Sequence, residues 1–140
     1  KRQSTEQPRL FSLPATTLEE LAKNMQGRLN ARALRVIGDP RMAARRVVLS
    51  PGFNNFPGIM RALDSPDVDV LVIGETREWE GVEYARDCVT AGKKKALIIL
   101  GHVPSEERGM EECARWLKTF ITEAPIRYLP GGDPFWRPRS

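Results

Sequence analysis

His102 is the only histidine of the 140-residue chain, and Glu106 follows it four positions later. Imidazole nitrogens and carboxylate oxygens are both ligands that borderline divalent ions such as zinc accept. The pair therefore indicates a metal site, although a catalytic metal usually keeps about three protein ligands. A hydrogen-bonded surface pair of the same two side chains is the alternative that the spacing leaves open.

Glu75 is a further acidic residue, and it stands at the end of an otherwise apolar segment. It could serve as a third ligand, as a general base, or as the group that orients His102. Alternatively, its charge complements the N-terminus of the helix that follows. Gly52, Gly74 and Gly101 would let the backbone approach a ligand closely, or they simply permit tight turns.

The elements that must position these residues follow from the hydrophobic pattern. Thr17 and Glu20 form a capping box, and apolar residues follow it at helical spacing as far as residue 30. Further helices are predicted to carry the apolar positions of residues 59–63, 79–89 and 110–121, the last of them capped by Ser105. Strands are predicted over residues 34–37, 46–50, 68–73, 96–100 and 126–129.

The alternation of strands and helices predicts an α/β fold, with a mostly parallel sheet and helices packed on its faces. Ligands of such sheets bind beyond the carboxyl ends of the strands, where the polar residues of this sequence stand. We expect residues 1–15 to be an N-terminal extension or linker, residues 16–130 to form one α/β domain, and residues 131–140 to be a C-terminal tail.

The composition narrows the class of protein. Apolar residues make up 41% and charged residues 29% of the chain, which is typical of a globular domain. The longest apolar run, residues 96–100, is far shorter than the roughly 20 residues of a membrane span. Cys88 and Cys113 form no CxxC motif, and the first residues do not resemble a secretory signal. We therefore expect a cytoplasmic protein with reduced thiols and no contact with a membrane.

The net charge of +4 arises in the first half of the chain, and two basic clusters stand out. One contains Arg41, Arg45 and Arg46, and the other is the triple lysine of residues 93–95. Either could contact phosphate groups, but solvated charges at strand ends are the simpler interpretation, because no stacking aromatic residues are interleaved with them. We do not expect nucleic acid as a partner. The three tryptophans are expected to pack in the core or at an interface.

The run VDVLVIGET and the later run LIILGHVPSEERG resemble the C-terminal motif region of the Nif-three-like dinuclear-metal hexameric proteins (NGG-one-interacting-factor-three). This group is also known as the GTP cyclohydrolase type-two homologue family. Upstream, LFSLPATTLEELAKNMQGRL, RVIGD and VVLSPGFNNF are similar to the segment that opens the second half of the family's chain. The resemblance extends over residues 9–135, and its most specific part is the GHxxxE motif of Gly101, His102 and Glu106.

The resemblance implies that His102 and Glu106 are ligands of a divalent ion such as zinc, iron or manganese. It implies that Glu75, which matches the family's Gly-Glu motif, lines the same site, and we assign it a catalytic role in handling protons or orienting a ligand. It further implies a Nif-three-like fold, a homo-oligomer, by resemblance a hexamer, and hydrolysis of a small nucleotide-like ligand.

Two departures from the family pattern bear on this expectation. Trp79 stands four residues after Glu75, where the family usually has a histidine. The family's remaining ligands, a histidine pair and an aspartate, lie in an N-terminal half that this sequence does not contain, so a pair of ions needs residues from outside this chain. We expect a fragment of a longer protein, because the sequence begins with Lys1 rather than Met; ligands from a partner chain or a degenerate site are the alternatives.

A second function stays open beside the metal site. The chain could be a non-catalytic interaction module that assembles into oligomers and acts as a scaffold for partners. Phosphate or nucleic-acid binding through the basic clusters is a third and weaker option.

Overall fold

The computed structural model describes residues 9–132 and 136, which form a mixed α/β fold around a five-stranded sheet. Residues 1–8, 133–135 and 137–140, which belong to the expected extension and tail, lie outside the described residues. The strands are β1 (Leu10–Ser12), β2 (Arg35–Ile37), β3 (Arg46–Asn54), β4 (Val70–Thr76) and β5 (Ala96–Ile99). The helices are α1 (Leu18–Leu29), α2 (Phe56–Asp64), α3 (Glu78–Thr90) and α4 (His102–Leu117).

The sheet has the strand order β1-β3-β4-β5-β2. The three central strands run parallel, whereas β1 pairs with β3 and β2 pairs with β5 in antiparallel fashion, so the prediction of a mostly parallel sheet is only partly confirmed. Buried residues run almost continuously through β4 and β5, which is typical of parallel strands covered on both faces. The carboxyl ends of the three central strands therefore meet at one edge of the sheet.

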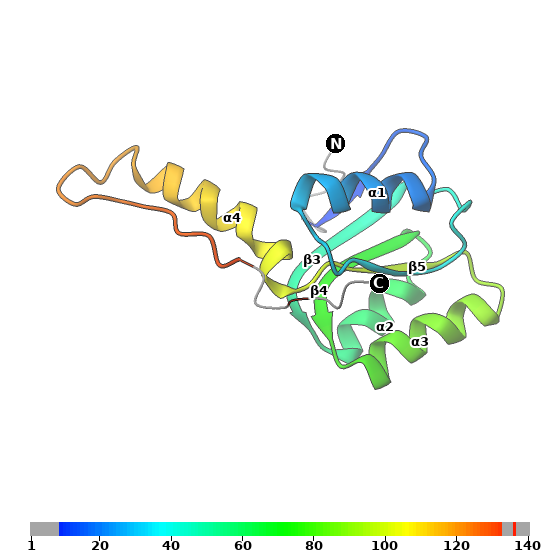
Figure 1. Ribbon diagram of the computed structural model, residues 1–140. Helices are drawn as coiled ribbons and strands as arrows, with labels where there is room; N and C mark the ends of the chain where they lie inside the picture. Colours follow the sequence, from blue (N-terminus) through cyan, green and yellow to red (C-terminus); the bar gives the residue numbers. More distant parts are fainter. Residues whose placement is uncertain (1–8, 133–135, 137–140) are drawn as a thin grey trace.

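Helices cover both faces of the sheet, with α1 on one side and α2 and α3 on the other (Figure 1). Leu18 and Leu21 of α1 belong to one cluster of buried residues, which also includes Val47, Val70 and Val72. Ile59, Leu63, Ala85 and Cys88 belong to the second cluster, with Leu71, Ile73 and Leu97. Successive residues of β4 thus alternate between two cores, which fixes the register of the strand.

The predicted capping box at the start of α1 is confirmed. Thr17 Oγ1 accepts a hydrogen bond of 3.2 Å from the backbone N–H of Glu20, and Glu20 Oε2 accepts one of 2.9 Å from the N–H of Thr17. Two N–H groups that would lack partners at the helix start are therefore satisfied. The helix ends at Leu29, and Asn30 follows in the left-handed conformation that commonly ends helices.

Several elements differ from their prediction, among them β3, which continues to Asn54 instead of ending at residue 50. Strand β1 was not predicted, because it lies within residues 1–15, which the sequence analysis assigned to an extension or linker, and it forms through its pairing with β3. No strand forms over residues 126–129; this segment runs beside α4 instead (Figure 1). Helix α4 begins at His102 with Gly101 as its N-cap, three residues before the predicted cap at Ser105.

Helix α4 extends beyond the edge of the sheet (Figure 1), so its expected inner face is only partly covered. Ala114 is the buried residue of this helix, while Met110 and Trp116 are both 59% exposed and Phe120 is 54% exposed. Trp79 is also exposed, because it lies at the first turn of α3 rather than over the sheet. Trp136 is exposed as well. The prediction that the tryptophans pack in the core is therefore wrong, and their place at an interface stays a prediction.

Within the described ranges, no helix is both long enough and apolar enough to cross a membrane. Cys88 on α3 is buried against the sheet, and Cys113 on α4 is partly buried; both are free thiols.

Candidate metal centre

Strands β4 and β5 bring Glu75 and His102 together. Their pairing continues past the end of β5, because the N–H of Leu100 donates to the carbonyl of Ile73 at 3.0 Å and that of Gly101 donates to the carbonyl of Gly74 at 2.9 Å. The next residue, His102, begins α4 and therefore lies beside Glu75. Backbone hydrogen bonds, rather than side-chain packing, fix this proximity.

The imidazole of His102 lies between two carboxylates. Its Nδ1 is 2.9 Å from Oε1 of Glu75, and its Nε2 is 3.1 Å from Oε2 of Glu106. Glu106 is one helical turn after His102 on α4, the spacing at which two side chains of a helix share a face. All three residues that the sequence analysis singled out are thus adjacent, and the side chains of His102 and Glu106 face each other.

The two carboxylates raise the pKa of His102 above its ordinary value. The hydrogen bond with Glu75 is the main cause, partial burial of the ring opposes it, and the charge of Glu106 adds to the increase. Because carboxylates only accept hydrogen bonds, both ring nitrogens donate when the ring is protonated. The side chains are 44% (His102), 51% (Glu75) and 47% (Glu106) exposed, so water weakens these interactions.

A bulge in β3, the neighbour of β4, supports the first turn of α4. The register of β3 against β4 shifts between Ser50 and Phe53, and Gly52 within the shift has a φ of 71°. The N–H of Gly52 donates to Oγ of Ser105 at 2.9 Å, and this hydroxyl donates in turn to the carbonyl of His102 at 2.6 Å. Ser105, predicted as a helix cap, instead connects β3 to α4.

Gly52 and Gly74 are required where they stand because the three strand ends approach closely. A Cβ atom at Gly52 would collide with Oε1 of Glu106 and lie 3.7 Å from Nε2 of His102. At Gly74, a Cβ atom would be 2.5 Å from Oγ of Ser105. The sequence left open close approach to a ligand or tight turns for these glycines; the structure shows that they allow close packing of the protein's own segments, and approach to a ligand stays a prediction. No sequence motif pointed to the part of Ser105 in this contact.

The donor atoms fit a divalent ion in part. Glu75 occupies Nδ1 of the imidazole, which leaves Nε2 and the carboxylate of Glu106 facing each other. Metal-binding histidines commonly have their second nitrogen held by a carboxylate in this way. Over residues 9–132 and 136, no group of three or more His, Cys, Asp and Glu side chains is placed to hold a metal ion. Further ligands would therefore come from water or from another segment.

A groove of about 450 Å³ begins at this cluster and continues along α4. His102 and Glu106 line its first part, and Met110, Leu117 and Ile126 line the remainder. The polar cluster thus opens onto an apolar surface formed by α4 and the segment that returns beside it. Such a surface could accommodate a ligand or a neighbouring chain next to the imidazole.

The family model of Duf34/NIF3 (NGG1p interacting factor 3) matches residues 4–128 of the sequence. The chain belongs to the Duf34/NIF3 family. This confirms the resemblance that the sequence motifs indicated. It also places the Glu75, His102 and Glu106 cluster within the part of the chain that defines membership of Duf34/NIF3.

Solved structures share the fold. A Bacillus cereus protein related to NIF3 is 20% identical with a TM-score of 0.69, over 91% of this chain and 35% of that protein. Staphylococcus aureus protein SA1388 is 19% identical with a TM-score of 0.60, over 86% of this chain and 36% of that protein. Protein ybgI, of unknown function, is 20% identical with a TM-score of 0.66, over 91% of this chain and 49% of that protein.

The present Duf34/NIF3 chain thus spans between about a third and a half of the length of these structures. At this level of identity the likeness concerns the fold alone. No curated protein matches the chain. These comparisons therefore do not assign an activity to this chain.

Proposed function

We propose that this Duf34/NIF3 chain binds a divalent metal ion through Nε2 of His102 and the carboxylate of Glu106. The observation that supports the proposal is the position of the imidazole between two carboxylates, 2.9 Å from Glu75 and 3.1 Å from Glu106. Glu75 holds Nδ1 and thereby turns Nε2 toward Glu106. A metal ion would replace the proton on Nε2, so binding competes with protonation and weakens as the pH falls.

Hydrolysis of a nucleotide-like substrate is the activity that we propose for this centre, on the strength of family membership. When bound, a divalent ion acts as a Lewis acid and lowers the pKa of the water that it coordinates. In this chain, His102 and Glu106 would hold the ion, and Glu75 would accept or deliver protons. The groove along α4 offers an apolar wall beside these groups.

Elemental analysis of the purified chain after extensive dialysis tests the proposal. Zinc, iron or manganese should be retained by the wild type and lost from His102→Ala and Glu106→Gln. Glu112→Gln is the matched control, because Glu112 lies on the same helix and is exposed away from the cluster. A folded wild type that takes up none of these ions from solution would contradict the proposal, as would equal loss of metal from all three variants.

Two exposed aromatic residues, one near the end of α4 and one in the turn that follows it, favour assembly as a second function. Trp116 and Phe120 are more than half exposed, and their rings pack edge to face with centroids 4.8 Å apart. Large exposed aromatic side chains next to an apolar groove are typical of protein interfaces. We propose that this surface joins copies of the chain in a homo-oligomer, and that a scaffold function could rest on this assembly alone.

The mass of the chain in solution tests this second proposal. Light scattering coupled to size-exclusion chromatography should give a multiple of the 15.8 kDa chain for the wild type. The Trp116→Ser, Phe120→Ser variant should be smaller, whereas Trp79→Ser, which alters an exposed tryptophan on α3, should keep the wild-type mass. A monomeric wild type over a wide range of concentrations would contradict assembly through α4.

A further inference from the structure

The opposite edge of the sheet carries a second cavity, which has no part in the metal centre. It measures about 980 Å³ and lies where β3, β4 and β5 begin, whereas His102 follows the end of β5. Its lining includes residues of three segments: the chain before β3, Asp69 before β4, and the loop between α3 and β5. Six basic side chains and two acidic ones contribute to this lining. The cavity contains both basic clusters of the sequence.

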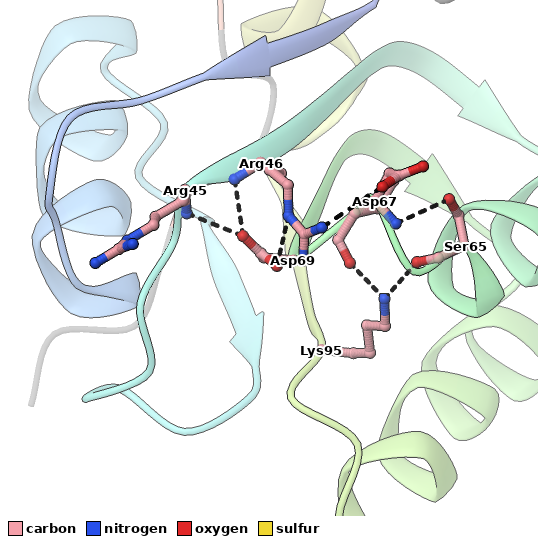
Figure 2. Close-up of polar contacts among 7 residues, drawn as sticks. Arg45, Arg46, Ser65, Asp67, Asp69 and Lys95 are labelled. Carbon is pink, nitrogen blue, oxygen red and sulfur yellow. Dashed lines mark hydrogen bonds and ion pairs between the residues drawn. The ribbon is translucent and has the colours of Figure 1, made fainter.

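Most of these basic groups are neutralised or occupied by the fold. The guanidinium of Arg46 contacts Asp69 at 2.6 Å and Asp67 at 3.7 Å (Figure 2). Nζ of Lys95 donates to the carbonyls of Ser65 and Val68, both at 2.5 Å. Arg46 and Lys95 therefore hold together the segments where β3, β4 and β5 begin, and we assign these two residues a structural role.

Two further basic groups have acidic partners. Lys93 contacts Asp64 at 3.0 Å, and Nε of the exposed Arg41 is 3.6 Å from Asp39. When Asp64 and Asp67 are counted with the two acidic residues of the lining, six basic groups face four carboxylates. An excess of two positive charges is left at the cavity.

Arg45 and Lys94 are the two basic groups of the lining whose side chains the fold leaves available, because the donors of Lys95 are taken by carbonyls. Among the residues that the structure describes, neither side chain has an ion pair or a hydrogen-bond partner. The backbone N–H of Arg45 donates to Asp69 Oδ2 at 3.2 Å, which fixes its backbone, while its side chain extends away from Asp69 (Figure 2). Lys94 comes from the loop on the other side of the cavity. Both side chains are exposed and available to a ligand.

We propose that this cavity is an anion site that binds a small molecule with adjacent phosphate groups, through Arg45 and Lys94. A guanidinium and an ammonium are the side chains that proteins use most for phosphate oxygens. The volume is at the upper end of the range of small-molecule sites. No aromatic residue lines the cavity within the described parts of the chain, so recognition rests on the phosphates rather than on stacking of a base.

Calorimetric titration with tripolyphosphate at low ionic strength tests the site, with the chain treated to remove metal ions. The wild type should bind tripolyphosphate saturably, and added salt should weaken binding because the contacts are ionic. The Arg45→Gln, Lys94→Gln variant should bind at least about tenfold more weakly, the loss expected when charge-assisted hydrogen bonds are removed. Removal of metal ions ensures that a centre at His102 does not bind the probe.

The matched control is the Arg28→Gln, Lys118→Gln variant, which has the same net charge but alters exposed residues of α1 and of the end of α4. It should bind tripolyphosphate like the wild type. Equal weakening in both double variants would overturn the proposal, because binding would then follow net charge alone. Absence of binding to the folded wild type would overturn it too. So would tight binding of a single-stranded oligonucleotide that tripolyphosphate does not displace.

Discussion

The backbone N–H of Gly52 donates a hydrogen bond of 2.9 Å to Oγ of Ser105, and this bond connects a bulge of β3 to the first turn of α4. Ser105 lies between His102 and Glu106 in the sequence, so the same turn carries both proposed metal ligands. A side chain at Gly52 would meet the carboxylate of Glu106 and would require this proposed metal ligand to move. Substitutions at this position should therefore affect both stability and metal binding.

Gly52→Ala should destabilise the chain and weaken metal binding. Its positive φ costs an L-residue about 1–2 kcal/mol, and the collision with Glu106 adds to this cost. Gly92→Ala is the matched control, since Gly92 has a similar φ of 78° but no neighbour within 4 Å of an added Cβ. Urea unfolding should show the larger loss for Gly52→Ala, and metal titration should show a loss for that variant alone. Equal losses of stability would disprove the collision.

Glu75→Gln should lower metal affinity without abolishing it. Removal of a carboxylate that orients a metal-binding histidine typically costs about 10–100-fold in affinity. Titration with zinc, compared with His102→Ala and with Glu78→Gln as a control on α3, measures the effect. Complete loss of binding, as in His102→Ala, would make Glu75 a ligand in its own right. Unchanged affinity would exclude both roles.

Asp69→Asn should reduce the free energy of unfolding at pH 7 by about 1.5–3 kcal/mol, the range for hydrogen bonds to charged groups. Burial raises the pKa of Asp69, but hydrogen bonds from Arg46 and from backbone N–H groups outweigh this and lower it below its ordinary value. A lowered folded-state pKa means that the stabilisation is complete above the unfolded-state pKa of about 3.9 and is lost as the pH falls through the folded-state pKa.

Urea unfolding at several pH values between neutral and acidic checks this prediction. The difference between wild type and Asp69→Asn should be constant near neutral pH and should shrink in the acid range. Asp67→Asn is the control, because Asp67 is largely exposed and lies 3.7 Å from Arg46. A difference that stays the same down to acid pH would show that the charge of Asp69 does not contribute.

Thr17→Ala should destabilise the chain by about 0.5–2 kcal/mol, because the N–H of Glu20 loses its acceptor. Thr17→Ser retains the hydroxyl and should retain most of the stability. Thermal unfolding of the three proteins measures the difference. Equal melting temperatures for the Ala and Ser variants would show that the capping box is not a significant source of stability.

The sequence predicted the centre of the fold because its signals there are local. The apolar runs of β4 and β5 and the capping box of α1 do not depend on distant residues. By contrast, β1 forms through its pairing with β3, and the segment over residues 126–129 is apolar without becoming a strand. Helical spacing alone could not distinguish a covered face of α4 from an exposed one.

The candidate site was predictable in its members but not in its geometry. His102 and Glu106 were singled out by residue type and spacing, and the structure brings Glu75 to the same ring. The contact between Gly52 and Ser105 joins residues far apart in the sequence, so no pattern pointed to it. Likewise, the sequence does not show which charged side chains at the basic cavity are paired, because this depends on the partners that the fold brings to each of them.

The pairing of β4 with β5 beyond the last residue of β5 has a thermal consequence. The amides of Leu100 and Gly101 take part in the ladder of the central sheet, so their protection against deuterium exchange should match that of the core strands. The backbone under the imidazole is then held by the central sheet, and an arriving cation would meet a receptor that is already ordered. Heating should release such a cation only when the sheet itself melts.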